Sequence, residues 1–193
     1  MTNQTNNINQ TNNINNINHT NHINHINQTN HINQTNHTNH TNHINHINKT
    51  AIITGASRGI GAAIAKKLAS CGYNLSLCCR NSSDRLKALA DELHCAYGIE
   101  VLCYTGNVGD FFFAKDMVTN TISHFGHIDV LINNAGISHI GLLSDMTPEE
   151  WNNIVAINLT GVFNFTKLVT PYMVADKCGR ILQISSVWGN VGA

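Results

Sequence analysis

From residue 49 onward, short apolar runs alternate with segments whose apolar side chains recur every three or four residues. The apolar runs predict strands at residues 50–54, 74–79, 100–105, 128–132 and 180–185. The helical spacing predicts helices at about residues 58–71, 83–94, 110–125 and 148–176. Strands that alternate with helices build a parallel sheet with helices on both faces. We therefore predict an α/β fold, a doubly wound parallel sheet in three αβα layers, truncated after the fifth strand.

The last of these helices has a clear N-terminal signal. Thr147 is a favourable N-cap residue, and Pro148 occupies the first helical position, where its missing N–H costs nothing. The next two residues are acidic, which suits the positive end of the helix dipole. We expect this long helical region to bend near Asn158 and near Pro171.

The first 48 residues follow a different pattern, in which every third residue is Asn. They read as triplets such as QTN, NIN, HTN and HIN, and they contain none of the chain's 11 basic and 11 acidic residues. Ile is the only apolar residue type after Met1, so burial cannot offset the entropy lost on ordering the backbone. We therefore predict a disordered low-complexity tract at 1–48 and one folded domain at 49–193.

A regular period of three leaves other interpretations of this tract open. It could wind into a β-solenoid with ladders of Asn side chains, and Asn-rich tracts tend to self-associate. Its eight His residues could capture transition metals as a tag does, but no Cys or carboxylate accompanies them, so we expect no dedicated metal site. One hypothesis for the whole chain is therefore an assembly or metal-binding element that carries the domain as a passenger.

Charge and cysteine content narrow the possible partners and compartment. The formal net charge is zero, which gives no indication of a nucleic-acid or acidic-membrane partner. We find no signal-peptide pattern and expect no membrane span. The six cysteines show neither metal-ligand nor disulfide-type spacing, and several lie in apolar runs. These features favour the cytoplasm.

A glycine-rich turn connects the first predicted strand to the first predicted helix. It reads TGASRGIG (54–61) and places glycines at Gly55, Gly59 and Gly61. Such a turn presents main-chain N–H groups and a helix N-terminus to a pyrophosphate, as in Rossmann-like dinucleotide-binding domains. We expect Gly55 to allow the tight turn, Gly59 to allow close approach of the phosphate, and Gly61 to allow the helix to pack closely.

The end of the second strand indicates which dinucleotide fits. An NAD site carries an acid about 20 residues after the glycines, but this chain has Arg80 and Asn81 there, and Arg58 lies in the glycine turn. Two guanidinium groups can bind a 2′-phosphate with paired hydrogen bonds. The pattern predicts NADP(H), the alternative being that both arginines are solvated surface residues.

Four motifs occur in an order and at a spacing that resemble the short-chain dehydrogenase/reductase family. They are TGASRGIG (54–61), NNAG (133–136), INLTG (157–161) and RILQISSVWG (180–189), and they span almost all of 49–193. The resemblance implies that the cofactor lies against Gly55, Ser57, Arg58, Gly59, Ile60, Gly61, Arg80, Asn81, Asn107, Val108, Asn134, Ala135 and Gly136. Asn107 stands where the family usually has Asp, and Asp129 would brace the fourth strand.

The resemblance also implies the reaction, a reversible reduction of a carbonyl to an alcohol with NADPH. In the family a Tyr protonates the carbonyl oxygen, and a Lys four residues later lowers the pKa of that Tyr. Ser186 corresponds to the family's catalytic Ser, which orients the carbonyl, and Asn158 to the Asn of its proton relay. The Tyr is expected about a dozen residues after Ser186, but the sequence ends at Ala193. We therefore expect the isolated chain to be inactive.

The substrate remains open between two carbonyl compounds, each carried on a protein. The segment SSVWGNVGA (185–193) resembles reductases that act on 5-aminopentanone-modified elongation factor P, which is the substrate class we favour from sequence. General resemblance supports 3-oxoacyl-acyl-carrier-protein reductases as the alternative. A hypothesis of another class is a non-catalytic fragment that only binds nucleotide. Full-length relatives are expected to be homo-oligomers.

Overall fold

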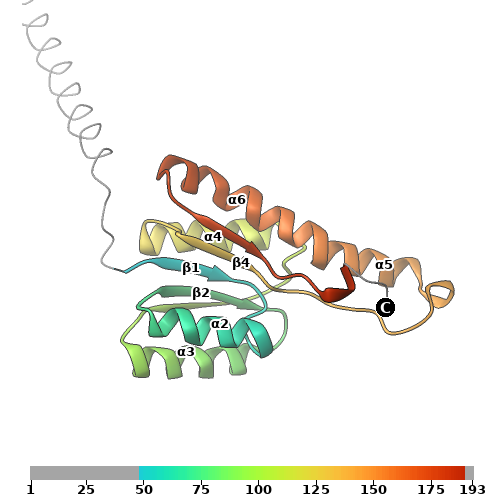
Figure 1. The fold of residues 1–193 in the computed structure, drawn as a ribbon, viewed down its shortest axis with the longest axis horizontal. Coiled ribbons are helices and arrows are strands. Elements are labelled where there is room, and N and C mark those ends of the chain that lie inside the picture. Colours follow the sequence, from blue (N-terminus) through green and yellow to red (C-terminus); the bar gives the residue numbers. More distant parts are fainter. Residues whose placement is uncertain (1–47, 190–193) are drawn as a thin grey trace, which may run out of the picture. The chain divides into compact units, whose positions relative to one another are not determined.

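In the computed structural model, residues 48–189 are described, and they contain a five-stranded parallel sheet (Figure 1). The strand order is β3-β2-β1-β4-β5. The strands are β1 (Thr50–Ile53), β2 (Asn74–Cys79), β3 (Val101–Thr105), β4 (Val130–Asn133) and β5 (Arg180–Gln183). The predictions for the tract at 1–48 fall almost entirely outside the described residues.

Helices cover both faces of this sheet, so the predicted doubly wound, three-layer α/β fold is confirmed. On one face lie α2 (Gly59–Ser70) and α3 (Ser83–Tyr97). On the other lie α4 (Phe111–Phe125) and a long helical region of α5 (Pro148–Val155), the π-helical turn η2 (Ala156–Thr160) and α6 (Gly161–Ala175). Short 3₁₀ turns occur at η1 (Leu143–Asp145) and η3 (Val187–Gly189).

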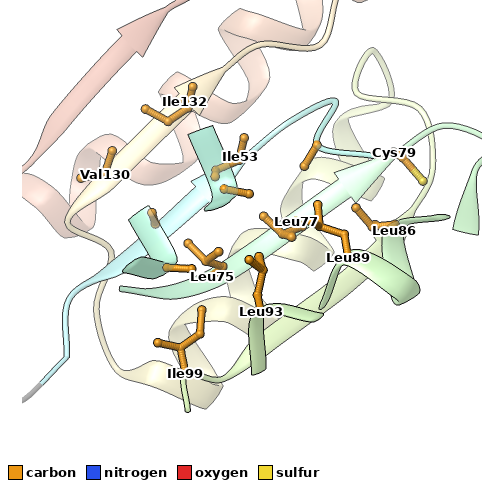
Figure 2. Close-up of a cluster of buried hydrophobic side chains, with 14 residues drawn as sticks. Ile53, Leu75, Leu77, Cys79, Leu86, Leu89, Leu93, Ile99, Val130 and Ile132 are labelled. Carbon is orange, nitrogen blue, oxygen red and sulfur yellow. The ribbon is translucent and has the colours of Figure 1, made fainter. Parts of the chain in front are cut away.

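Each face of the sheet has its own apolar core, because the strands alternate their side chains between the two faces. Figure 2 shows the first core, in which Leu75 and Leu77 of β2 pack against Leu86 and Leu93 of α3. The second core joins Leu131 of β4 to α4 and α6. Strands buried on both faces require apolar residues at successive positions, which is the pattern that the sequence shows.

The long helical region departs from a plain α-helix where a bend was expected. At Asn158 the structure has the π-helical turn η2, whereas α6 continues through Pro171 without a break. By length and composition, Pro148–Ala175 could cross a membrane, although we expected no such segment. The core helix of a soluble protein passes the same test, and Phe165 and Val169 belong to the second core.

The start of α5 confirms the predicted N-terminal signal and adds a reciprocal contact to it. The Thr147 hydroxyl accepts a hydrogen bond from the Glu150 N–H at 3.2 Å, and the Glu150 carboxylate accepts one from the Thr147 N–H at 2.9 Å. This main-chain donor lowers the pKa of the Glu150 carboxyl below its ordinary value. These two reciprocal hydrogen bonds, a capping box, are therefore formed at neutral pH. The stability that they contribute is lost as the pH falls through the lowered pKa of Glu150.

We predict that Thr147→Ala lowers the free energy of unfolding by about 1 kcal/mol at neutral pH, because the capping hydrogen bond is lost. Urea unfolding followed by circular dichroism measures the change. Thr170→Ala, an exposed Thr inside α6, is the matched control. Ala favours a helix interior, so this control should not be destabilised. An equal loss in both variants would contradict a specific capping role.

Candidate functional site

The carboxyl ends of all five strands meet at one edge of the sheet and bring the predicted site residues to the same edge. The chain runs outward from β1 to β2 and β3, and then returns to add β4 and β5 on the other side of β1. The crevice between β1 and β4 is therefore the point where the direction of winding reverses. In open α/β sheets, ligands bind at such a switch point.

The glycine turn after β1 contains two glycines with positive φ values. Gly55 and Gly59 have φ values of +66° and +57°, which side chains rarely adopt. A Cβ on Gly59 would meet no atom within 4 Å, so this residue borders open space. A Cβ on Gly61 would lie 2.5 Å from the Gly55 carbonyl oxygen, so only Gly allows α2 to start this close to the turn. The positive φ of Gly55 suits its predicted role in a tight turn, and the short contacts at Gly61 suit its predicted role in helix packing, whereas approach of a phosphate at Gly59 stays a prediction.

Helix α2 begins directly after the glycine turn, at Gly59. Arg58 is the N-cap residue, and among the described residues no side-chain hydrogen bond caps this helix. The first N–H groups of a helix have no partner within the helix, and they carry its positive partial charge. The turn therefore offers an anion the donors that a capping side chain would otherwise occupy.

The segment after β4 holds the glycine turn in place. The Asn134 side-chain amide donates to the main-chain oxygens of Thr54 (3.0 Å) and Gly55 (3.1 Å). In return, the Thr54 hydroxyl oxygen accepts from the N–H groups of Asn134 and Ala135, both at 3.0 Å. Asn134 was expected to line the cofactor groove, and the structure gives it a bracing role. Thr54, the first residue of the glycine motif, was not among the predicted site residues.

The arginine side chains predicted to select the cofactor lie on neighbouring strand ends. Arg58 follows β1, and Arg80 follows β2, which pairs with β1 in parallel. Arg58, Arg80 and Asn81 are all exposed. No acidic residue occupies the end of β2. Both arginines are therefore accessible to solvent, and their contact with one ligand stays a prediction.

The loop after β3 is held by internal hydrogen bonds and by a buried Val. The Asn107 side-chain oxygen accepts from the Gly109 N–H at 3.1 Å, and the Asp110 N–H donates to the Asn107 carbonyl at 2.9 Å. Val108 is buried in the second core. The Asn107 side chain thus stabilises the loop through its oxygen, and its predicted place beside the adenine stays a prediction.

Asn158 lies in the π-helical turn η2, and its side chain contacts the loop after β4. Its amide nitrogen donates to the Ile137 carbonyl at 2.8 Å, and its oxygen accepts from the Ile137 N–H at 2.9 Å. Isolated π-helical turns frequently occur at functional sites. The structure therefore brings Asn158 together with Gly136 and Ile137, a contact that only the fold could reveal.

Ser186 follows β5, the strand next to β4, and its main-chain oxygen accepts from the Gly189 N–H at 3.0 Å. Beneath this end of the sheet, the Thr166 hydroxyl bonds to the side-chain amides of Asn133 (3.2 Å) and Gln183 (3.3 Å). This polar group ties α6 to β4 and β5 just below the loops that carry the predicted site residues. The sequence analysis did not identify Thr166 or Gln183.

The thiols of Cys78 and Cys103 are not candidate nucleophiles. Burial raises the pKa of the Cys78 thiol to about 12, and mainly burial raises that of Cys103 to about 11. Both thiols are therefore protonated at neutral pH, and a thiol reacts as its thiolate. Within residues 48–189, no three His, Cys, Asp or Glu side chains form a group that could hold a metal ion.

A parallel sheet with a glycine turn at its switch point defines a Rossmann-like α/β domain. The family model for short chain dehydrogenases matches residues 49–193. This chain therefore belongs to the short-chain dehydrogenase family.

Individual relatives agree with this assignment. A 3-oxoacyl-acyl-carrier-protein reductase of Staphylococcus epidermidis is 41% identical over 144 residues, covering 75% of this chain and 59% of the relative. A D-beta-hydroxybutyrate dehydrogenase of Cupriavidus necator is 38% identical over 145 residues, covering 75% of this chain and 55% of the relative. A crystal structure of a metagenomic short-chain oxidoreductase in complex with NADP superimposes with a TM-score of 0.71 at 36% identity, covering 75% of this chain and 65% of that chain. The chain thus spans less than two thirds of the length of these relatives.

Proposed function

We propose that this chain forms the NADP(H)-binding part of an oxidoreductase that interconverts a carbonyl and an alcohol. The observation that carries the proposal is the glycine turn, with open space at Gly59 and an N-terminus of α2 that no side chain caps. The NADP complex of the metagenomic relative supports the same choice of ligand. The family assignment supports the oxidoreductase class.

The residues present fit such a cofactor. The helix N-terminus would bind the pyrophosphate, and Ser57, Gly59 and Ile60 would surround it. Arg58 and Arg80, with Asn81 beside them, would hold the 2′-phosphate, while Asn107 and Val108 would form the adenine side of the site. The nicotinamide ring supplies hydride transfer, and the protein orients the ring against the substrate.

Two residues would act closer to the reacting carbonyl. We propose that Ser186 orients the carbonyl by hydrogen bonding, as its position after β5 suggests. Asn158 uses both polar atoms of its side chain on Ile137, so we propose that it supports the reaction by holding the loop after Gly136 in place. That loop, with Ala135 and Gly136, would form one wall of the cofactor groove.

For the substrate, the relatives support the 3-oxoacyl group of an acyl-carrier protein, which was the alternative in the sequence analysis. They give no support to the 5-aminopentanone substrate that we favoured from the segment around Trp188. The D-beta-hydroxybutyrate dehydrogenase has nearly the same identity to this chain, so overall similarity alone does not determine the substrate. A carbonyl substrate carried on a protein partner is thus our proposal, together with a homo-oligomeric full-length enzyme in the cytoplasm.

The proposed cofactor is tested by the Arg80→Ala variant. Removing one charge-assisted hydrogen bond costs about 1.5–3 kcal/mol, so the Kd for NADPH should rise about tenfold or more. The Kd for NADH should not change, because NADH has no 2′-phosphate. Fluorescence titration of the two nucleotides against the chain measures both constants.

Arg180→Ala is the matched control for this test, because Arg180 is also exposed but begins β5 at the opposite edge of the sheet. It should leave both constants unchanged. Equal affinity of the unaltered chain for NADPH and NADH would refute the NADP(H) assignment. So would an unchanged ratio of the two constants in Arg80→Ala.

A further inference from the structure

Asn164 is a buried polar residue of α6 to which neither the sequence nor the proposed reaction gives a role. Its side chain is 2% exposed and lies between α6 and the loop after β3. Its amide nitrogen donates to the carbonyl oxygens of Val108 and Gly109, both at 3.2 Å. A buried amide is retained without a large cost only where its hydrogen bonds are made, and here both bonds go to a single loop.

The same loop meets the helical region at two further points where only small residues fit. A Cβ on Gly109 would lie 2.7 Å from the Ala156 carbonyl oxygen. A Cβ on Gly161 would lie 2.8 Å from a methyl group of Val108. The loop is therefore pressed against η2 and the first turns of α6, and Asn164 supplies the hydrogen bonds of this close contact.

We propose that Asn164 is a positioning residue that sets the adenine side of the cofactor site by fixing the main chain at Val108 and Gly109. This proposal rests on the proposed NADP(H) site. Without the Asn164 donor, two carbonyl oxygens lose their partner in a buried contact, and they regain hydrogen bonds only if the loop moves outward toward water. Such a movement displaces Asn107 and Val108, and it leaves the glycine turn, which Asn134 braces, in place.

The proposal predicts a loss of affinity confined to ligands that contain the adenosine half of the cofactor. In Asn164→Leu, an apolar replacement of similar size, the Kd for NADPH and for adenosine 2′,5′-bisphosphate should rise about tenfold. The Kd for reduced nicotinamide mononucleotide should change less than twofold. Fluorescence titration measures NADPH, and ligand-observed NMR measures the two smaller ligands against the 193-residue chain.

A second variant, Gly109→Ala, tests the position of the loop after β3 without changing Asn164. Gly109→Ala should push the loop away from the Ala156 carbonyl without altering Asn164, and it should produce the same adenosine-selective loss. Asn153→Leu, an exposed Asn of α5, is the matched control and should bind all three ligands like the unaltered chain. Circular dichroism before each titration shows whether a variant is folded.

The possible results separate this proposal from the one on which it rests. An unaltered chain that binds neither NADPH nor the bisphosphate overturns the proposed function and this proposal with it. If the unaltered chain binds both, unchanged affinities in Asn164→Leu and Gly109→Ala overturn the positioning role alone. An equal weakening of the adenosine ligands and the mononucleotide, or unfolding of both variants, also overturns it, because the role of Asn164 would then be only to stabilise the fold.

Discussion

A polypeptide of residues 1–193 should bind NADPH but reduce carbonyl compounds no faster than background. Residues 187–193 contain no Tyr and no Lys. A polypeptide of residues 1–193 alone would therefore lack the Tyr and Lys that the family resemblance places after Ser186. A positioned general acid contributes about 10²–10⁴-fold to the rate. NADPH oxidation at 340 nm, with a short 3-oxoacyl thioester as substrate, measures the rate.

Carbonyl reduction should be recovered when the chain is extended by the segment that the family places after Ser186. Fusing residues 49–193 to the remaining portion of a reductase relative, including its Tyr-x-x-x-Lys motif, should recover NADPH oxidation. In that chimera, Ser186→Ala should lower kcat by at least about tenfold, because the carbonyl would lose one hydrogen bond in the transition state. The matched control is Ser70→Ala at the exposed end of α2, which should leave kcat unchanged.

Turnover by residues 1–193 alone, persisting through repurification from a host that lacks related reductases, would show that the catalytic acid lies elsewhere in the chain. Restored turnover that is insensitive to Ser186→Ala would instead remove Ser186 from the site.

Among residues 48–189, β5 lies at one edge of the sheet, and this position affects the expected solubility. All four β5 residues are exposed, including Ile181 (36%) and Leu182 (46%). An apolar strand with a free edge is a ready partner for another strand. Residues 1–193 alone should therefore be less soluble than the chimera.

The fold could be predicted from the sequence because its signals are local and repeated. Strand β4 is a short, mainly apolar run (Val130–Asn133), and α3 has apolar residues at helical spacing (Leu86, Leu89 and Leu93). These apolar patterns arise from burial against the parallel sheet, so they can be recognised in the sequence without knowing which distant residues are in contact. The predicted ends of the elements differ from the observed ends by only a few residues. The strand predicted at 128–132, for example, is observed at Val130–Asn133.

The contacts within the site could not be predicted in the same way, because they join residues far apart in the chain. The Asn134 amide reaches the main chain of Thr54 and Gly55, about 80 positions earlier in the sequence. The Asn158 amide donates to the Ile137 carbonyl, and the Asn164 amide donates to the Val108 carbonyl, 56 positions earlier in the sequence. Motifs indicated which loops meet at the site, but no periodicity distinguishes an Asn that would touch a ligand from one that braces a neighbouring turn.

The substrate was harder still to predict. The preference for a 5-aminopentanone reductase depended on a few residues around Trp188, near the end of the sequence, and the relatives instead support a 3-oxoacyl substrate. Substrate choice depends on the loops that enclose the reacting group, and the matched relatives extend well beyond the portion that this chain covers.

Gly61→Ala should abolish most nucleotide binding, in contrast to the single-contact effect of Arg80→Ala. The new Cβ would lie 2.5 Å from the Gly55 carbonyl oxygen, 2.6 Å from the Asn134 amide nitrogen and 3.0 Å from the Ala56 Cα. Two of these atoms are main chain and the third is held by two hydrogen bonds, so the start of α2 must move. Movement of α2 misplaces several phosphate donors at once, and losing two charge-assisted hydrogen bonds raises the Kd about 100-fold or more.

The comparison with Gly72→Ala separates this steric effect from backbone strain. Gly72 follows α2 at φ +81°, and a Cβ there would meet no atom within 4 Å, so Gly72→Ala should cost about 1–2 kcal/mol of stability and leave NADPH binding unchanged. Gly61→Ala should cost about 1–3 kcal/mol through overpacking and lose binding as well. Urea unfolding and NADPH titration of both variants measure the two quantities. If Gly61→Ala binds NADPH like the unaltered chain, the contact between α2 and the turn does not position the phosphate donors. The nucleotide would then have to bind elsewhere along the carboxyl edge of the sheet.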